Sequence, residues 1–195
     1  MQDALVHLSG VLSAQTNHSM AVEILDSALE LAEGAHGTDG IALVPILHAR
    51  AECMERAGTE LALAAAELAR AREIRRKAFG ENSMDAAFAA FNLASLLVKG
   101  SQEEGCIADR RAMLVERAVG LTLEACSVAC AKQEHDQGAD LVSEILAALD
   151  AEEVLANRAA DAQMQRLKDA FLEAVGEEWE PLTGEEGEEG EEGED

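Results

Sequence analysis

The chain has 195 residues and a formal net charge of −24. So strong an acidic excess repels nucleic-acid phosphates and anionic membrane surfaces, which argues against either as a partner. Apolar residues form 48% of the chain but aromatic residues only 3%, prolines number two, and no segment alternates like a half-buried strand. These features predict an all-α fold whose helices pack closely through alanine and leucine.

The predicted helices follow one another as pairs separated by glycine-containing turns. The first covers residues 3–15; the second begins after Ser19, the expected N-cap, and ends near Glu33, where Gly34, Gly37 and Gly40 interrupt it. The later helices are expected at 41–57, 60–78 (after a break at Gly58-Thr59), 83–99, 107–133, 138–154 and 157–175. The predicted domain therefore spans 1–176, with hairpins at about 3–34, 41–78, 83–133 and 138–175.

A short apolar pattern recurs once in each predicted hairpin. Its copies are Ala21…Leu25…Ala28, Ala64…Leu68…Ala71 and Ala160…Met164…Leu167, with a weaker copy at Ala118…Thr122…Ala125. The leading alanines are 43, 54 and 42 residues apart, a period typical of stacked helical hairpins. We attribute the longer spacing to an insertion around 101–111. The 43-residue shift also aligns Gly37 and Asp39 with Gly80 and Asn82.

The stretch 71–97 resembles the tetratricopeptide repeat (TPR), in the longer version of about 42 residues found in kinesin light chains. The features that carry this resemblance are Ala71, Gly80, Asn82 and Asn92-Leu93-Ala94. The resemblance covers 3–175 and implies antiparallel hairpins stacked as a short TPR-like α-solenoid. Two features depart from the family: the first-helix aromatic is mostly missing, and Thr122 replaces a large apolar residue. A generic α-solenoid or an irregular helical bundle stays open as the alternative.

By this resemblance the first helix of each hairpin lines a concave groove that binds a segment of a partner protein. The positions carried across are Val6, Ala49, Cys53, Arg56, Asn92, Leu96, Lys99, Ile145, Leu149 and Glu152. Asn92 is expected either to hold the ligand's peptide backbone or to be satisfied by the neighbouring hairpin. Arg56 and Lys99 either face an acidic ligand or complement helix dipoles. Some family members clamp a ligand's C-terminal carboxylate with several Lys, Arg and Asn residues. Here the position that matches Asn92 in the preceding repeat is Ala49, so a full clamp is absent.

The remaining polar clusters predict no chemistry. Cys126 and Cys130, one helical turn apart near His135, are better interpreted as reduced core residues than as a zinc site. The basic run from Arg70 to Lys77 spirals around its helix and is interpreted as a solvated helix end. No phosphate loop, metalloprotease motif or nucleophile elbow occurs. We therefore expect no enzymatic activity, no cofactor and no metal.

Residues 177–195 contain eleven acidic residues and no basic one, ending in GEEGEEGEEGED. This composition predicts a disordered tail after an apolar patch at Trp179 and Pro181-Leu182. The tail resembles tubulin C-terminal tails, which implies glutamylation or glycylation in a ciliated cell; the alternative is a solubilising tail.

The sequence as a whole predicts a cytoplasmic scaffold or adaptor for other proteins, acting through the groove and the acidic tail. The resemblance of the tail to tubulin tails implies that the protein belongs to the cytoskeleton of a cilium or axoneme. An acidic chaperone or carrier for basic proteins such as histones is the alternative function. No signal peptide is recognised at the N-terminus.

Overall fold

The computed structural model describes residues 10, 17–58, 61–103, 106–132, 134–150 and 158–175. Most of these residues are helical, and none of them lies in a strand. The helices are α2 (His18–His36), the short 3-10 helix η1 (Ile41–Leu43), α3 (Val44–Ala57), α4 (Leu61–Phe79), α5 (Met84–Ser101), α6 (Ala108–Ala131), α7 (His135–Asp150) and α8 (Arg158–Val175). Apart from residue 10, the predicted helix at 3–15 falls outside this description, as does the tail at 177–195.

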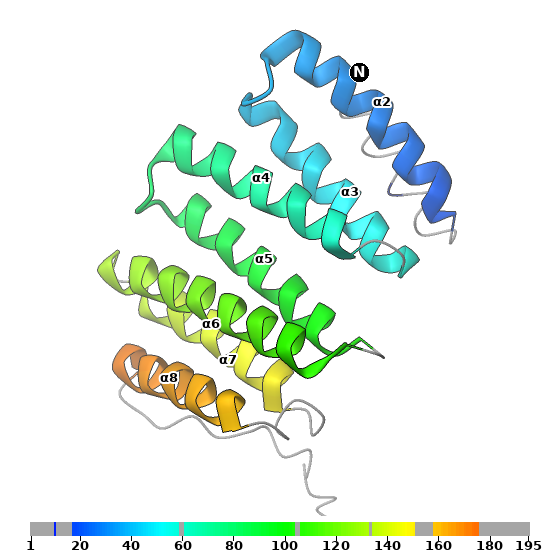
Figure 1. The fold of residues 1–195 in the computed structure, drawn as a ribbon. Helices are drawn as coiled ribbons and strands as arrows, with labels where there is room; N and C mark the ends of the chain where they lie inside the picture. The colour runs from blue at the N-terminus through cyan, green and yellow to red at the C-terminus, as the bar shows by residue number, and fades with distance from the viewer. Residues whose placement is uncertain are drawn as a thin grey trace, which may run out of the picture.

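The helices stack one upon another, as Figure 1 shows. Each of the helices from α2 to α8 packs against the next one along the chain, and α5 also contacts α7 while α6 contacts α8. The α3, α5 and α7 helices therefore form one layer, and α2, α4, α6 and α8 form the other. This arrangement confirms the predicted all-α, TPR-like stack of hairpins.

The recurring apolar pattern occupies the centre of the packed layers. Each alanine of the three copies that begin at Ala21, Ala64 and Ala118 is 0% exposed, as are Leu25 and Leu167. Alanine at these positions lets neighbouring helices approach closely with no loss of side-chain entropy. Thr122 is also 0% exposed, and its hydroxyl donates to the Ala118 carbonyl at 3.0 Å. That hydrogen bond within α6 explains how a hydroxyl is accommodated in the core.

Two predicted boundaries of the second helix are wrong. The N-cap is Asn17 rather than Ser19, since the Asn17 side chain accepts from the Met20 backbone N–H. Gly34 does not break α2, which continues to His36. The chain turns at Gly37, which has φ of 77°, and the aligned Gly80 has φ of 92°. Glycine adopts this left-handed region without the penalty that a Cβ brings, so both loops turn at a glycine with a positive φ.

The expected insertion around 101–111 is largely absorbed into helices. The α5 helix has 18 residues against 14 in α3, and α6 has 24 against 19 in α4. Ser101 still belongs to α5, and α6 has already begun at Ala108. Arg111 fastens the intervening turn by donating to the Ser101 carbonyl at 3.0 Å. The longer spacing between the repeats therefore lengthens one hairpin rather than adding a free loop.

One arginine joins three consecutive helices. The guanidinium of Arg50 on α3 contacts Asp26 of α2 and Glu67 of α4, each at 2.7 Å. The Arg50 and Glu67 side chains are only 13% and 11% exposed, so water screens this pair little. The loss of either partner would leave a partly buried charge without compensation.

The basic run on α4 also joins neighbouring helices and loops, which the interpretation as a solvated helix end missed. Arg70 contacts Glu33 of α2 at 2.5 Å and the Thr38 carbonyl at 2.8 Å. Lys77 contacts Asp39 at 2.9 Å, and Arg72 reaches Glu124 of α6 at 2.5 Å. These partners lie 32 to 52 residues away in the sequence, a range in which helical periodicity gives no information.

Ala64→Leu should overpack the contact between the α4 helix and its neighbours. We expect the free energy of unfolding to fall by about 1–3 kcal/mol, because the closely packed core has no space for three more carbon atoms. Chemical denaturation followed by circular dichroism measures the change. Ala66→Leu, on the exposed side of the same helix, is the control. Equal stability of the two variants would contradict the packing described above.

Arg50→Ala should lower the free energy of unfolding by about 2–3 kcal/mol, because it leaves Glu67 partly buried without its cation. Arg56→Ala on the same helix removes an exposed pair with Glu52 and should cost less than about 1 kcal/mol. Urea denaturation of both variants gives the comparison. A similar loss in the two variants would show that the bridge from Arg50 contributes no more than a surface pair.

Candidate functional site

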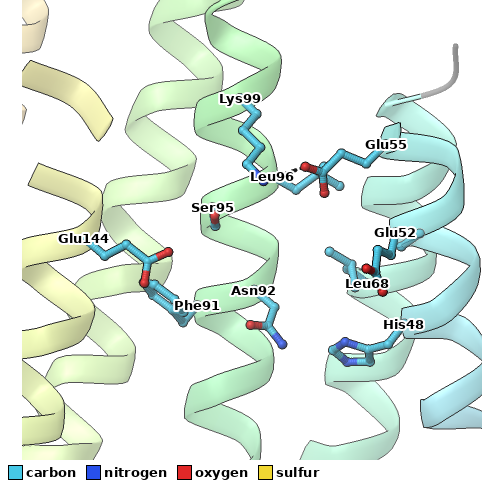
Figure 2. A pocket seen from close by; sticks show the side chains of 11 residues that line it. His48, Glu52, Glu55, Leu68, Phe91, Asn92, Ser95, Leu96, Lys99 and Glu144 are labelled. Atoms are coloured by element: carbon cyan, nitrogen blue, oxygen red, sulfur yellow. Dashed lines mark hydrogen bonds and ion pairs between the residues drawn. The ribbon is translucent and has the colours of Figure 1, made fainter. Parts of the chain in front are cut away.

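An open cavity of about 290 Å³ lies on the layer formed by α3, α5 and α7 (Figure 2). Its floor is apolar and its margin is polar. The lining comprises His48, Ala51, Glu52 and Glu55 of α3, Leu68 of α4, Phe91, Asn92, Ser95, Leu96 and Lys99 of α5, and Glu144 of α7. We call this set the groove cavity. Its walls come from the first helices of successive hairpins, which is the layer that the family resemblance implies for a groove.

Asn92 is available for binding within the groove cavity. It lies half-buried on α5, four residues before Leu96 and seven before Lys99, so helical periodicity places these residues on one face. Its side chain makes no hydrogen bond with any residue that the structure describes. Figure 2 shows Asn92 extending toward His48 of α3 across the cavity. The side-chain amide can therefore donate to and accept from a peptide backbone.

The two cations expected to face an acidic ligand are both paired with carboxylates. Lys99 contacts Glu55 across the cavity margin at 2.5 Å, and Arg56 contacts Glu52 within α3 at 2.6 Å. Lys99 lines the cavity, whereas Arg56 does not. Glu144 adds a carboxylate that has no partner among the described residues. The groove cavity is thus acidic overall, which favours a cationic ligand over an acidic one.

On α3 the cavity wall is displaced by one residue from the expected set. His48, Glu52 and Glu55 line it instead of Ala49, Cys53 and Arg56. Cys53 is buried in the core between α3 and the neighbouring α2 and α4 helices. One residue corresponds to a rotation of about 100° on a helix, so a small error in register moves a side chain from the groove to the core.

The same displacement occurs on α7. Ile145 and Leu149 are each 1% exposed and belong to the main hydrophobic core, so neither reaches the cavity, whereas Glu144 does. Three predicted positions, Asn92, Leu96 and Lys99, do line one cavity. The remaining two, Val6 and Glu152, are not among the residues described. The sequence does carry a signal for the register of α7. Residues 145 and 149 are apolar, as core positions require, whereas residue 144 is acidic.

His48 is the unusual titratable group of the cavity. Its Nε2 atom is buried and has no hydrogen-bond partner among the described residues. Burial, assisted by the positive charge of Arg75, lowers the pKa of His48 from 6.5 to about 4. The imidazole is therefore neutral at pH 7 and can accept or donate one hydrogen bond toward the cavity.

Cys126 and Cys130 lie at the interface of α6 with its neighbours. Their sulfur atoms are 4.0 Å apart, and both thiols are free. Burial, with the adjacent Cys130 thiol, raises the pKa of Cys126 to about 12, so this sulfur stays protonated. Cys126 is buried as expected, whereas Cys130 is partly exposed. Within the described ranges no three His, Cys, Asp or Glu side chains converge as metal ligands.

Comparisons with known proteins give the fold a context. No family model matches the sequence, and no curated protein is similar to it. Among solved structures, BtubC (BKLC) from P. vanneervenii is similar over 92% of this chain and 66% of its own, with 16% identity and a TM-score of 0.56. This chain thus spans about two thirds of BtubC. Kinesin light chain TPR-like repeats of Podosopora anserina match with 14% identity and a TM-score of 0.47 over 89% of this chain and 86% of theirs, and a point variant of those repeats gives the same values.

The likeness to BtubC and the stacked hairpins define the class of the fold: it is a TPR-like stack of helical hairpins. At such low sequence identity the likeness concerns the fold alone. No described helix is long and apolar enough to cross a membrane.

Lowering the pH from 7 toward 4 should destabilise the wild-type chain more than His48→Gln. Above its usual pKa of 6.5, His48 is neutral in both states. Between 6.5 and about 4 the unfolded chain binds a proton that the folded chain excludes, so stability falls across this window. Melting temperatures measured at several pH values give the difference. His36→Gln, at an exposed histidine, should follow the wild type; identical pH profiles for all three chains would contradict the assignment.

Proposed function

We propose that the protein is a non-enzymatic scaffold that holds a segment of a partner protein in the groove cavity. The observation that carries this proposal is the open cavity between α3 and α5, lined by an asparagine without a described partner above an apolar floor. A partner side chain fills the apolar part, and its backbone exchanges hydrogen bonds with Asn92. This combination gives both affinity and register.

The charge of the cavity specifies the partner further. Lys99 is neutralised by Glu55, and Glu144 is left without a described cation. A segment that carries lysine or arginine next to an apolar residue complements this arrangement. The partner segment is therefore basic and amphipathic, unlike the acidic ligand that the two cations first indicated.

The high acidic charge favours a second function, a carrier or chaperone for basic proteins. The net charge of −24 and the acidic tail attract cationic clients without requiring a shaped cavity. The two functions differ in their dependence on Asn92 and on salt. A role in a cilium or on the axoneme rests only on the resemblance of the tail to tubulin tails.

The test is affinity purification from the native cells with the full chain, Asn92→Ala and Asn82→Ala as baits. Asn82 is exposed in the turn before α5, so its variant is the matched control. For a groove-held partner we expect Asn92→Ala alone to lower the affinity roughly tenfold, the effect of about 1.4 kcal/mol of lost hydrogen bonding. Equal recovery with all three baits would contradict the groove.

A second arm separates scaffold from carrier. If the partner is held in the groove, we expect it to stay bound when the glutamates of the tail are changed to glutamine. Moderate salt should weaken that binding only in part. Loss of basic proteins with the neutral tail or with salt, together with indifference to Asn92→Ala, would establish the carrier instead.

A further inference from the structure

A second cavity, of about 230 Å³, lies on the opposite layer between α4 and α6. Its apolar lining includes Leu61, Leu97, Leu114 and Met113, and Met113 is 59% exposed. Arg110 and Arg117 of α6 stand at its edge. We call it the arginine cavity. An apolar hollow bordered by cations is suited to a bulky apolar side chain flanked by carboxylates.

The two arginines differ from most other cations of the described part. Arg50, Arg70, Arg72, Lys77 and Lys99 all contact carboxylates of other helices or loops. Arg110 and Arg117 make no hydrogen bond or ion pair with any described residue. In a chain of net charge −24, two such arginines beside one apolar cavity form a surface that has no acidic counterpart among the described residues.

The chain itself contains a segment of the required chemistry at 177–182, with the sequence EEWEPL. Trp179 and Leu182 are bulky and apolar, and Glu177 and Glu180 stand on either side of the tryptophan. Arg110 and Arg117 are two helical turns apart, about 10.5 Å along the axis. Three extended residues, from Glu177 to Glu180, span about 10 Å. Pro181 favours that extended conformation at the preceding residue. Spacing, charge and apolar content therefore match.

The short length of chain between α8 and Trp179 favours docking in another molecule over docking in the arginine cavity of the same molecule. The α8 helix ends at Val175, and four further residues span at most about 14 Å. Figure 1 shows α8 running in the same direction as α6, so the C-terminal ends of the two helices point toward the same side of the stack. From Arg117 to its C-terminal end α6 extends about 21 Å. In addition, α8 contacts α6 and α7 but neither α4 nor α5, which form the rest of the cavity.

We propose that the arginine cavity binds residues 177–182 of a second copy of this chain, with Trp179 in the hollow and Glu177 and Glu180 on Arg117 and Arg110. The exchange is reciprocal in a two-fold dimer, in which each copy contributes the segment that fills the other's cavity. This docking is independent of the groove cavity and of the function proposed for it.

The test uses the full chain and its single tryptophan. At rising protein concentration Trp179 emission should shift to shorter wavelength and become protected from acrylamide, while sedimentation shows a doubling of mass. Arg110→Glu/Arg117→Glu should raise the concentration for half-protection by at least about tenfold. Arg56→Glu/Arg166→Glu, an equal charge change at exposed arginines elsewhere, should leave it close to the wild type. Circular dichroism verifies that every variant is folded.

A charge exchange completes the experiment. Glu177→Arg/Glu180→Arg introduced into the Arg110→Glu/Arg117→Glu chain should restore protection and dimer formation. Three outcomes would overturn the proposal: a tryptophan that is exposed at every concentration, protection that does not depend on concentration, and protection that the arginine changes leave intact. The first means that the cavity does not hold Trp179, the second that the segment docks within its own chain, and the third that it docks elsewhere.

Discussion

The close approach of helices at alanine is the constraint on which the other features depend. The pattern that begins at Ala21, Ala64 and Ala118 places side chains of minimal size where α2, α4 and α6 meet their neighbours. Because the alanines hold the helices at those contacts, the residue in the middle of each copy lies beneath the layer formed by α3, α5 and α7. In the second copy this residue is Leu68, which also forms the floor of the groove cavity. The repeat thus sets both the core and the depth of the candidate site.

Ion pairing distributes charge in a way that follows from this packing. Arg50 and the basic run of α4 lie against acidic residues of neighbouring helices and loops, so these cations contribute to cohesion between hairpins. Lys99 is likewise neutralised by Glu55. Few cations then remain for ligands, and the groove cavity keeps an excess of carboxylates. Arg110 and Arg117, on the longest described helix, make no ion pair with any described residue.

The sequence predicts the helices and their stacking well, because alanine periodicity and glycine turns are local signals that repeat. It predicts the cavity less well, because the residues lining α3 and α7 depend on rotation about each helix axis. The pattern beginning at Ala21 fixed the rotation of α2, α4 and α6, whereas α3, α5 and α7 lack such a pattern. Asn92, Leu96 and Lys99 line the groove cavity, whereas Cys53 and Ile145 lie in the core. Contacts such as Arg72 with Glu124 join distant positions and leave no periodic trace.

The two cavities share one side chain. Leu96 of α5 lines both the groove cavity and the arginine cavity, so it separates a face bordered by carboxylates from a face bordered by guanidinium groups. Leu96 is buried, and in a closely packed interior such a side chain has few alternative positions. The α5 helix thus contributes residues to both cavities and forms the wall that keeps them apart.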